Sequence, residues 1–114
     1  MLVRKATDVR QDDVDAEGAA GAKIRWLLTK EDGAPNFAMR EFELAPGGHT
    51  PHHAHGWEHE VYVLAGEGAV AGEAGEFALE PGMVVLVPPN EKHNFKNTGA
   101  APFRFLCVVP HGAK

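Results

Sequence analysis

The sequence GGHTPHHAHGWEHEVYVLAG occupies residues 47–66 and contains five of the seven histidines of the chain. Imidazole is the commonest protein ligand for divalent transition metals, so this density indicates a metal site. In an extended strand alternate residues face the same side, which places His53 and His55 on one face. His59 has the same parity and joins them if the strand resumes after a turn at Gly56. The stretch therefore predicts three histidines that converge on one side of a sheet.

A second histidine signal lies in GMVVLVPPNEKHNFKN, residues 82–97. The apolar run over residues 83–87 is typical of a strand that is buried on both faces. It ends at a Pro-Pro-Asn turn, after which His93 opens the next expected strand. The turn thus separates a predicted core strand from a fourth candidate metal ligand.

Together these two segments resemble the paired motifs of the cupin superfamily. The first motif is a glycine, His-x-His after five residues, a carboxylate after three or four more, and a final glycine. Its positions are taken here by Gly47, His53, His55, His59 and Gly66. The second motif, from a glycine through Pro-x-Gly to a histidine and an asparagine, is matched by Gly82, Pro88, His93 and Asn97. Asn90 replaces the turn glycine, which asparagine can do because it tolerates the left-handed conformation, and His59 replaces the carboxylate.

The histidine at the carboxylate position makes the chain similar to small single-domain cupins that have four histidine ligands and are reported with manganese. The resemblance covers about residues 34–110 and implies the metal ligands His53, His55, His59 and His93. It also implies one divalent ion per chain, Mn2+ first, although imidazole suits Fe2+, Ni2+, Cu2+ and Zn2+ as well. Glu58 or Glu60 is the alternative ligand, although strand parity points both away. The remaining histidines are expected on the surface: His49, His52 and His111.

Length, charge and cysteine content exclude several classes of protein. A chain of 114 residues is long enough for one domain with its own core. The formal net charge of −5, with no cluster of lysine and arginine, argues against nucleic-acid binding. Cys107 is the single cysteine, which excludes an internal disulfide and fits a reducing compartment. No apolar stretch is long enough for a signal peptide or a bilayer span, so we predict a soluble cytoplasmic protein without a membrane partner.

About nine or ten short strands punctuated by turns, without a long helical period, predict an all-β sandwich or barrel. The cupin resemblance implies a jelly roll, a single domain over residues 1–114 with its core at about 34–110. Residues 1–8 are a candidate short strand and residues 8–21 a polar loop, and this N-terminal segment is a candidate dimer interface. A jelly roll of this size leaves edge strands that a second copy can cover, which predicts a homodimer.

Candidate pocket residues follow from strand parity and from closeness to the two motifs. They are Phe42, Trp57, Phe95 and Phe105, and for each of them ordinary core packing is the alternative. Arg40 lies in phase with apolar residues of its strand, so it is either a pocket residue that holds an anionic substrate or a salt-bridged strand end. Tyr62 is a second candidate for acid–base chemistry. Cys107 is either a small buried hydrophobe or a group close to the metal, and it is the third catalytic candidate.

The function preferred from sequence alone is a metal-dependent oxidoreductase of the dioxygenase type. It would activate dioxygen or peroxide at the four-histidine site and act on a small organic substrate. The first alternative is a redox-silent isomerase, lyase or cyclase, which needs a general acid or base beside the metal. The second is a non-catalytic module that binds a small ligand. An enzyme is favoured because four ligands leave open coordination positions on a six-coordinate ion.

Overall fold

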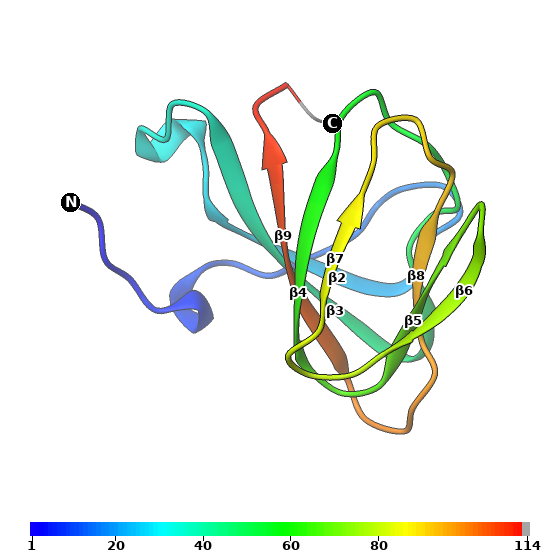
Figure 1. The fold of residues 1–114 in the computed structure, drawn as a ribbon. Helices are drawn as coiled ribbons and strands as arrows, with labels where there is room; N and C mark the ends of the chain where they lie inside the picture. The colour runs from blue at the N-terminus through cyan, green and yellow to red at the C-terminus, as the bar shows by residue number, and fades with distance from the viewer. Residues whose placement is uncertain (113–114) are drawn as a thin grey trace.

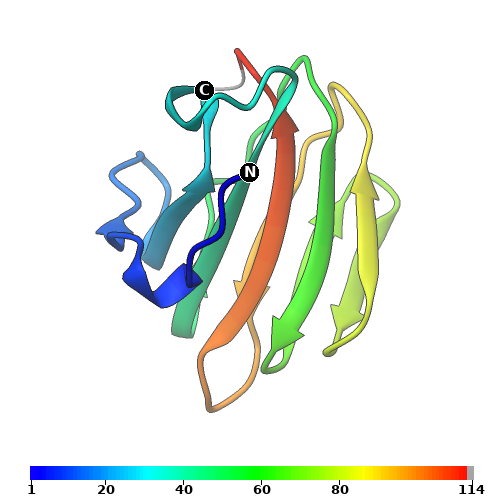
Figure 2. The ribbon, with the colours of Figure 1, turned by 90° about the vertical axis from the view of Figure 1, so that its left-hand side faces the viewer.

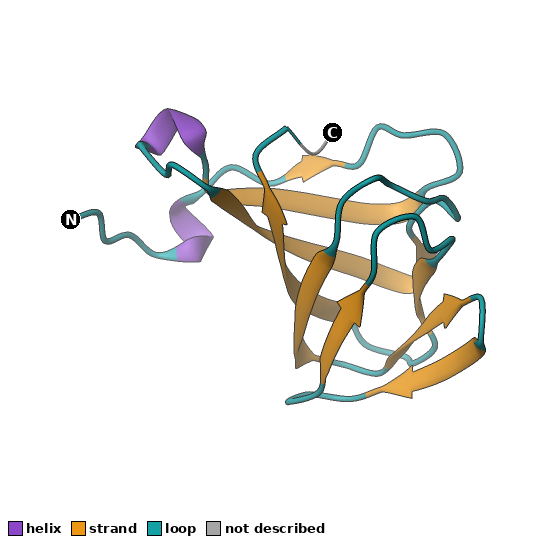
Figure 3. Cartoon of the chain, turned by 45° about the horizontal axis from the view of Figure 1, so that its top comes forward, coloured by secondary structure: helices purple, strands orange, loops and turns teal. Residues whose placement is uncertain are grey.

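Nine β-strands form one curled antiparallel sheet in the computed structural model, which describes residues 1–112 (Figure 1). The strands are β1 (Asp12–Asp13), β2 (Ala20–Leu28), β3 (Phe37–His49), β4 (His59–Ala65), β5 (Gly68–Gly72), β6 (Gly75–Leu79), β7 (Val84–Val87), β8 (Asn94–Asn97) and β9 (Phe103–Pro110). Two single-turn 3-10 helices, η1 (Ala6–Asp8) and η2 (Lys30–Asp32), complete the regular structure of these residues (Figure 3). No helix within residues 1–112 has the length and apolar character needed to cross a membrane. The predicted all-β jelly-roll class is confirmed.

The sheet folds back on itself into two facing layers. Its strand order is β6-β5-β8-β3-β9-β4-β7, with β2 paired to β3 and β1 paired to β2. In Figure 2, β2, β3, β9, β4 and β7 lie side by side in one layer, with β5 and β6 behind them. Strand β3 joins the two layers, because it pairs with β9 from Phe37 to Leu44 and reaches β8 through His49, opposite Lys96. The curl creates the interior that holds the core and the candidate site.

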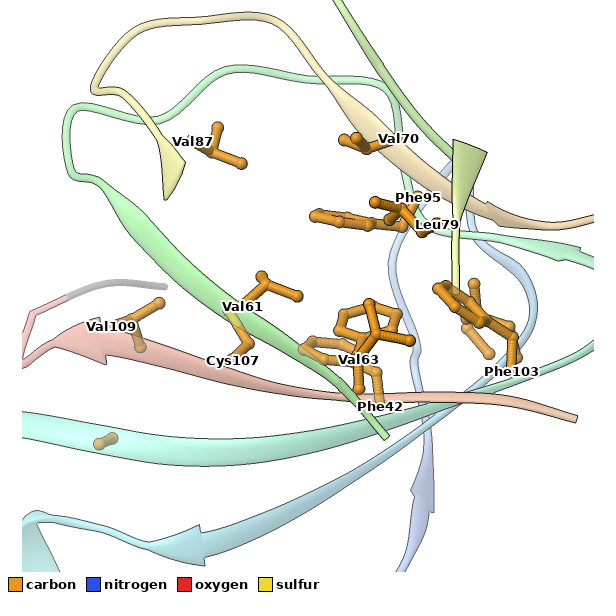
Figure 4. Close-up of a cluster of buried hydrophobic side chains, with 14 residues drawn as sticks. Phe42, Val61, Val63, Val70, Leu79, Val87, Phe95, Phe103, Cys107 and Val109 are labelled. Carbon is orange, nitrogen blue, oxygen red and sulfur yellow. The ribbon is translucent and has the colours of Figure 1, made fainter. Parts of the chain in front are cut away.

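The core fills the space between the layers (Figure 4). Strand β9 sends every second residue into it, and these residues are Phe103, Phe105, Cys107 and Val109, each at most 2% exposed. Val61 and Val63 join them from β4, while Val70, Leu79 and Phe95 face them from the other layer. Such alternation is what a strand with one face in a core requires.

The prediction of a fully buried strand at residues 83–87 is wrong, because these residues form an edge strand. Strand β7 pairs with β4 and ends the strand order. Only Val87 is buried, at 4% exposure, whereas Val84 and Leu86 are 71% and 64% exposed on the outer face of the layer. A continuous apolar run does not distinguish a strand covered on both faces from an edge strand with an uncovered face.

The N-terminal segment also differs from its prediction. Residues 1–8 contain no strand and end in the 3-10 turn η1. Strand β1 pairs with β2 of the same chain. Both β1 and the start of β2 at Ala20 lie within residues 8–21, which were expected to form a loop. The Arg25 guanidinium donates a hydrogen bond to the Val9 carbonyl oxygen, which ties the segment to β2. A role of this segment in a dimer stays a prediction.

The motif asparagine, Asn97, fixes a turn. The Nδ2 atom of Asn97 donates hydrogen bonds to the carbonyl oxygens of Leu44, at 2.9 Å, and Ala101, at 2.8 Å. Its Oδ1 atom accepts from the backbone N–H of Gly99 at 2.8 Å. The amide therefore ties the β8–β9 turn to β3 and takes no part in the candidate site.

Gly66→Ala is expected to destabilise the fold by more than about 2 kcal/mol, because a left-handed backbone costs a non-glycine residue roughly 1–2 kcal/mol and overpacking adds to that. Gly66 has a φ of +84°, and a Cβ atom there would overlap the Pro102 carbonyl oxygen and approach the Phe103 Cα atom to 2.9 Å. Gly56→Ala is the matched control, since no heavy atom lies within 4 Å of a Cβ built there. Urea unfolding of both variants measures the effect, and equal stabilities would contradict this account of the turn.

Candidate metal centre

A cavity of about 390 Å³ lies on the inner face of the curled sheet. Its walls come from β1, β2, β3, β4, β8 and β9 and from the loops that precede β4 and β8. The lining residues are Asp12, Asp13, Val14, Asp15, Ala16, Ile24, Trp26, Arg40, Phe42, Thr50, Pro51, His53, His55, Trp57, His59, His93, Phe95, Phe105 and Cys107. The cavity thus joins both histidine motifs to the aromatic core.

Three of the four predicted metal ligands come together in this cavity. His55, His59 and His93 each offer one ring nitrogen, and these nitrogens all lie within 4.8 Å of one another. His59 and His93 are only 6% and 5% exposed, and His55 is half-buried. Imidazole nitrogens bind a transition metal at about 2.1 Å, so ligands of one ion lie roughly 3–4 Å apart. The cluster therefore has the chemistry and nearly the spacing of a metal site.

His53 lies beside the cluster without being part of it. Its ring centroid is 4.1 Å from that of His55 and 6.0 Å from that of His93. The backbones of His53 and His93 are bridged by two N–H···O hydrogen bonds of 3.1 Å and 3.0 Å. The bridge holds the two histidine motifs together, while the His53 side chain is exposed at the rim.

The hydrogen bonding of the buried rings fits a metal ion. The Nδ1 atom of His93 lies 2.8 Å from the Glu91 carbonyl oxygen, so this nitrogen carries the proton and donates. The Nδ1 atom of His59 lies 3.2 Å from the sulfur of Cys107. Its Nε2 atom is buried and has no hydrogen-bond partner among the described residues. A buried polar atom of this kind requires an explanation, and a coordinated ion would satisfy it.

The electrostatic environment keeps the rings of His55 and His59 neutral. Burial is the main cause that lowers the pKa of His59 to about 3, and the nearby charge of Arg40 adds to it. Burial also lowers the pKa of His55 to about 4, with further repulsion from His53 and His93. A neutral imidazole offers its lone pair to a metal, and a protonated one does not. Both rings are therefore ready to bind an ion at neutral pH.

The metal-free protein is expected to lose stability as the pH falls from about 6.5 towards 5. An ordinary histidine has a pKa of 6.5, whereas the pKa values of His55 and His59 are about 4 and about 3 in the fold. Between these values the unfolded chain binds protons that the folded chain excludes, so the free energy of unfolding rises with pH. Urea unfolding across this window, in which most carboxylates stay ionised, measures the slope.

The control for this pH dependence is a variant with His55→Gln and His59→Gln, which removes the two histidines whose pKa values are about 4 and about 3. Its free energy of unfolding should vary less between pH 6.5 and 5 than that of the parent, because glutamine has no proton to bind. Parallel slopes in the two proteins would contradict the assignment to these histidines.

The aromatic residues singled out from the sequence all line the cavity. Phe105 is central among them, with ring centroids 5.3 Å from Phe42 and 4.8 Å from Phe95. Trp57 stacks on His55 at 4.6 Å with an interplanar angle of 9°. These rings are both core residues and pocket residues, because they pack in the hydrophobic core and also line the cavity.

Of the three catalytic candidates, Arg40 and Cys107 lie at the cavity and Tyr62 does not. Arg40 lines the cavity, donates from Nη2 to the sulfur of Cys107 at 3.0 Å, and lies over the rings of Trp26 and Phe42. Within residues 1–112 it forms no ion pair, so it is not the salt-bridged strand end that was the alternative. Cys107 is buried against Arg40 and His59.

Tyr62 lies outside the site, so the prediction that it is a catalytic residue is wrong. Residues of β4 alternate between the two faces of the sheet, so His59 and Tyr62, three positions apart, face opposite sides. The tyrosine side chain is about half exposed on the outer surface, where it adjoins Val84 and Leu86. It has no route to the histidine cluster without a change in strand register.

An acidic wall of the cavity was missed by the sequence reasoning. Asp12, Asp13 and Asp15 line the cavity because β1 pairs with β2 beside it. Trp26, on β2, contributes a further aromatic face below Arg40. The only available signal was the acidic run of residues 12–15, which had no periodicity to place it. These carboxylates are candidates for the general acid or base that the redox-silent alternative needs.

Three known proteins are similar to the chain over most of its length. The glucose-6-phosphate isomerase of Thermococcus gammatolerans is 42% identical, over 98% of this chain and 70% of the relative. Protein SchB of Streptomyces halstedii is 32% identical, over 93% of this chain and 78% of the relative. The structure of the polyketide cyclase RemF from Streptomyces resistomycificus superimposes with a TM-score of 0.93 and 36% identity, over 99% of this chain and 81% of that one.

The family comparison agrees with the motifs and with the fold. The family described as the cupin domain matches residues 40–109, which is more than half of the chain. The match includes all three histidines of the cluster and runs from β3 to β9. The chain therefore belongs to the cupin family.

Proposed function

We propose that the chain is a metal-dependent cyclase that closes a ring in a polyketide-type substrate without net oxidation or reduction. The observation that carries the proposal is the cavity, which has three clustered imidazoles on one side and aromatic side chains around them. The similarity to the polyketide cyclase RemF, at 36% identity over nearly the whole chain, supports the same substrate class.

In this proposal His55, His59 and His93 hold one divalent ion, and His53 turns inward as the fourth ligand. A divalent ion at this place supplies Lewis acidity, which polarises a carbonyl group and makes the adjacent C–H more acidic. The ion first predicted is Mn2+. Imidazoles alone discriminate poorly among divalent metals, so elemental analysis of the purified protein is the test of its identity.

The other lining residues have roles that suit ring closure. Phe95, Phe105 and Trp57 give the cavity an aromatic, apolar wall that suits a flat conjugated chain and keeps water away from it. Arg40 is the only lysine or arginine among the residues that line the cavity, so its guanidinium is placed to stabilise negative charge on an enolate oxygen. An aspartate of the acidic wall is a base for the proton of the activated C–H.

The reaction balances without an external oxidant. A proton leaves a carbon between two carbonyl groups, and that carbon forms a bond to a distant carbonyl carbon of the same chain. The carbonyl oxygen takes up a proton to give a hydroxyl group. This group then leaves as water together with the second hydrogen of the attacking carbon, which forms the double bond of the ring. Every step moves protons, so acid–base groups and charge stabilisation suffice.

Sugar-phosphate isomerisation is the second candidate function, and the 42% identity to an archaeal glucose-6-phosphate isomerase favours it. This reaction also moves a proton beside a carbonyl group, so the histidine cluster suits it equally. The cavity lining suits it less, because it includes one guanidinium and three carboxylates, whereas a phosphate group needs cations. We therefore rank it second.

The oxidoreductase preferred from the sequence stays a prediction, and the surroundings of the cluster favour redox-silent chemistry over it. The sulfur of Cys107 is 3.2 Å from the His59 ring. A thiol so close to a centre that activates peroxide or dioxygen would be exposed to oxidation to sulfenic and sulfinic acids. A centre that only polarises a carbonyl group produces no oxidant that could attack the thiol.

The proposed function is tested with metal-loaded protein and a synthetic poly-β-ketone thioester, under dioxygen-free conditions. Chromatography with mass detection should find a cyclised product that has lost water, and His59→Ala should reduce its rate to the uncatalysed level. His52→Ala is the matched control, because His52 does not line the cavity. Turnover that appears only when dioxygen is admitted would favour the oxidoreductase. A protein that converts added glucose 6-phosphate but not the thioester would favour the isomerase.

We also propose that the chain forms a homodimer. The outer face of β4 and β7 exposes Tyr62, Val84 and Leu86 around an apolar hollow, and a second copy would cover it. Light scattering should give twice the mass of 12.3 kDa. A monomeric mass at micromolar concentration, together with full activity, would contradict the proposed homodimer.

A further inference from the structure

Three polar side chains from three neighbouring strands meet behind the histidine cluster. Arg40 on β3 lies opposite Cys107 on β9, and His59 begins the adjacent strand β4. The sulfur of Cys107 is 3.0 Å from the Nη2 atom of Arg40 and 3.2 Å from the Nδ1 atom of His59. The two nitrogens are themselves 3.4 Å apart. Sulfur, guanidinium and imidazole therefore form one compact group.

Donor and acceptor chemistry assigns the direction of these contacts. If the buried Nε2 atom of His59 presents its lone pair to the cluster, the ring proton must be on Nδ1. The guanidinium of Arg40 has donors only, so the two nitrogens cannot hydrogen-bond to each other in this tautomer. The sulfur of Cys107 is then the acceptor that both N–H groups share. Cys107 is 2% exposed, so solvent has little access to replace it.

We infer that Cys107 is a positioning residue of the metal centre, whose sulfur accepts the Nδ1–H of His59 and fixes the tautomer that leaves Nε2 free for a divalent ion. This inference rests on the metal centre of the proposed function. Arg40 supports it by holding the sulfur from the other side, and its guanidinium is held in turn by the rings of Trp26 and Phe42.

The tautomer of His93, the second buried histidine of the cluster, is fixed in the same way. His93 donates from Nδ1 to the Glu91 carbonyl oxygen at 2.8 Å, which fixes its tautomer with Nε2 free. An outer acceptor that orients each ligating imidazole is a general requirement of metal sites. For His59 no backbone carbonyl fills this place among the described residues, and the thiol of Cys107 does so instead.

The first test is the Zn2+ affinity of the whole chain, measured by competition with a chromophoric chelator. Cys107→Ala should bind Zn2+ about 10–100-fold more weakly than the parent, which is the usual effect of losing an outer-shell partner. Cys107→Ser retains an acceptor at the same position and should recover most of the loss. Val109→Ala is the packing control, because Val109 is equally buried on the same face of β9 but does not line the cavity. It should bind Zn2+ like the parent.

The second test reads the tautomer directly in the metal-free protein by 15N–1H correlation of the imidazole nitrogens. The His59 ring should carry its proton on Nδ1 in the parent and in Cys107→Ser. In Cys107→Ala it should change towards the Nε2–H form that free imidazole prefers in water. This readout does not depend on enzyme activity, and a loss of packing alone would not produce it.

The outcomes separate this inference from the proposed function. A parent that binds no Zn2+ would overturn the metal centre and the role of Cys107 with it. A parent that binds Zn2+, beside a Cys107→Ala variant that binds it equally well, would overturn the positioning role alone. Equal losses in Cys107→Ala and Val109→Ala, or no recovery in Cys107→Ser, would also overturn it, because packing would then explain the effect.

Discussion

His93→Ala is expected to remove the metal ion from the protein and to abolish the proposed cyclisation. His93 supplies one of three ring nitrogens that lie within 4.8 Å of one another, and its ring is almost fully buried. Loss of a ligand should weaken metal binding by more than the roughly 10–100-fold that loss of an outer partner causes. The metal content after dialysis, determined by elemental analysis, should fall from about one ion per chain to a trace.

The control for this experiment is His52→Ala, which removes an imidazole from the same histidine-rich stretch but outside the cavity. It should keep the metal content and the activity of the parent. Full metal occupancy in His93→Ala, or an equal loss in both variants, would contradict the assignment of the centre. The second result would indicate that the ion is held by the exposed histidine-rich loop.

Phe105→Ala is expected to destabilise the fold by about 3–5 kcal/mol, the usual range for a buried phenylalanine. Phe105 is 1% exposed, and its ring centroid lies 4.8–5.3 Å from those of Phe42, Phe95 and Phe103. Its removal leaves a hole where the two layers of the sheet meet, and it also opens the wall of the cavity. Urea unfolding monitored by circular dichroism measures the loss.

Phe37→Ala is the matched control for the core prediction. Phe37 begins β3 but is 61% exposed, so its truncation removes little buried surface and should change the free energy of unfolding by less than about 0.5 kcal/mol. If the two variants unfolded at the same urea concentration, Phe105 would not be the centre of the core. A variant of Phe105 that is too unstable to purify agrees with the prediction, and Phe105→Leu then gives a smaller, measurable loss.

The features that were predictable from the sequence depend on local geometry. The shared face of Phe103, Phe105, Cys107 and Val109 can be read from the sequence, because alternation is a property of the backbone itself. The same parity assigned His53, His55 and His59 to one side of the chain. His93 joined them through the pairing of two distant loops, which the motif resemblance supplied and parity alone did not.

The features that were missed depend on long-range packing. The apolar residues of β7 do not reveal that the strand lies at an edge, since its neighbours along the sheet are set by topology. The acidic residues of β1 reach the cavity only because β1 pairs with β2, and nothing in their spacing indicates that pairing. For Arg40 the residue pattern left two roles open, and the three-dimensional neighbours Trp26 and Cys107 decided between them.

The order of hypotheses about function changes for the same reason. A redox-silent reaction needs a general acid or base beside the metal, and strand parity points the nearby Glu58 and Glu60 away from it. The fold brings Asp12, Asp13 and Asp15 into the lining of the cavity that contains the histidine cluster. With these groups present, the cyclase becomes the function that the cavity and the similarity to RemF jointly favour.

The metal centre is tested most directly by X-ray absorption spectroscopy of the untagged parent protein loaded with Zn2+. We predict one ion per chain with a scattering pattern from three or four imidazole nitrogens at about 2.0–2.1 Å, of which three are those of the histidine cluster. The remaining ligands should be light oxygen atoms. A spectrum without imidazole scattering, or binding far below one ion per chain, would contradict a metal centre at this place in the fold.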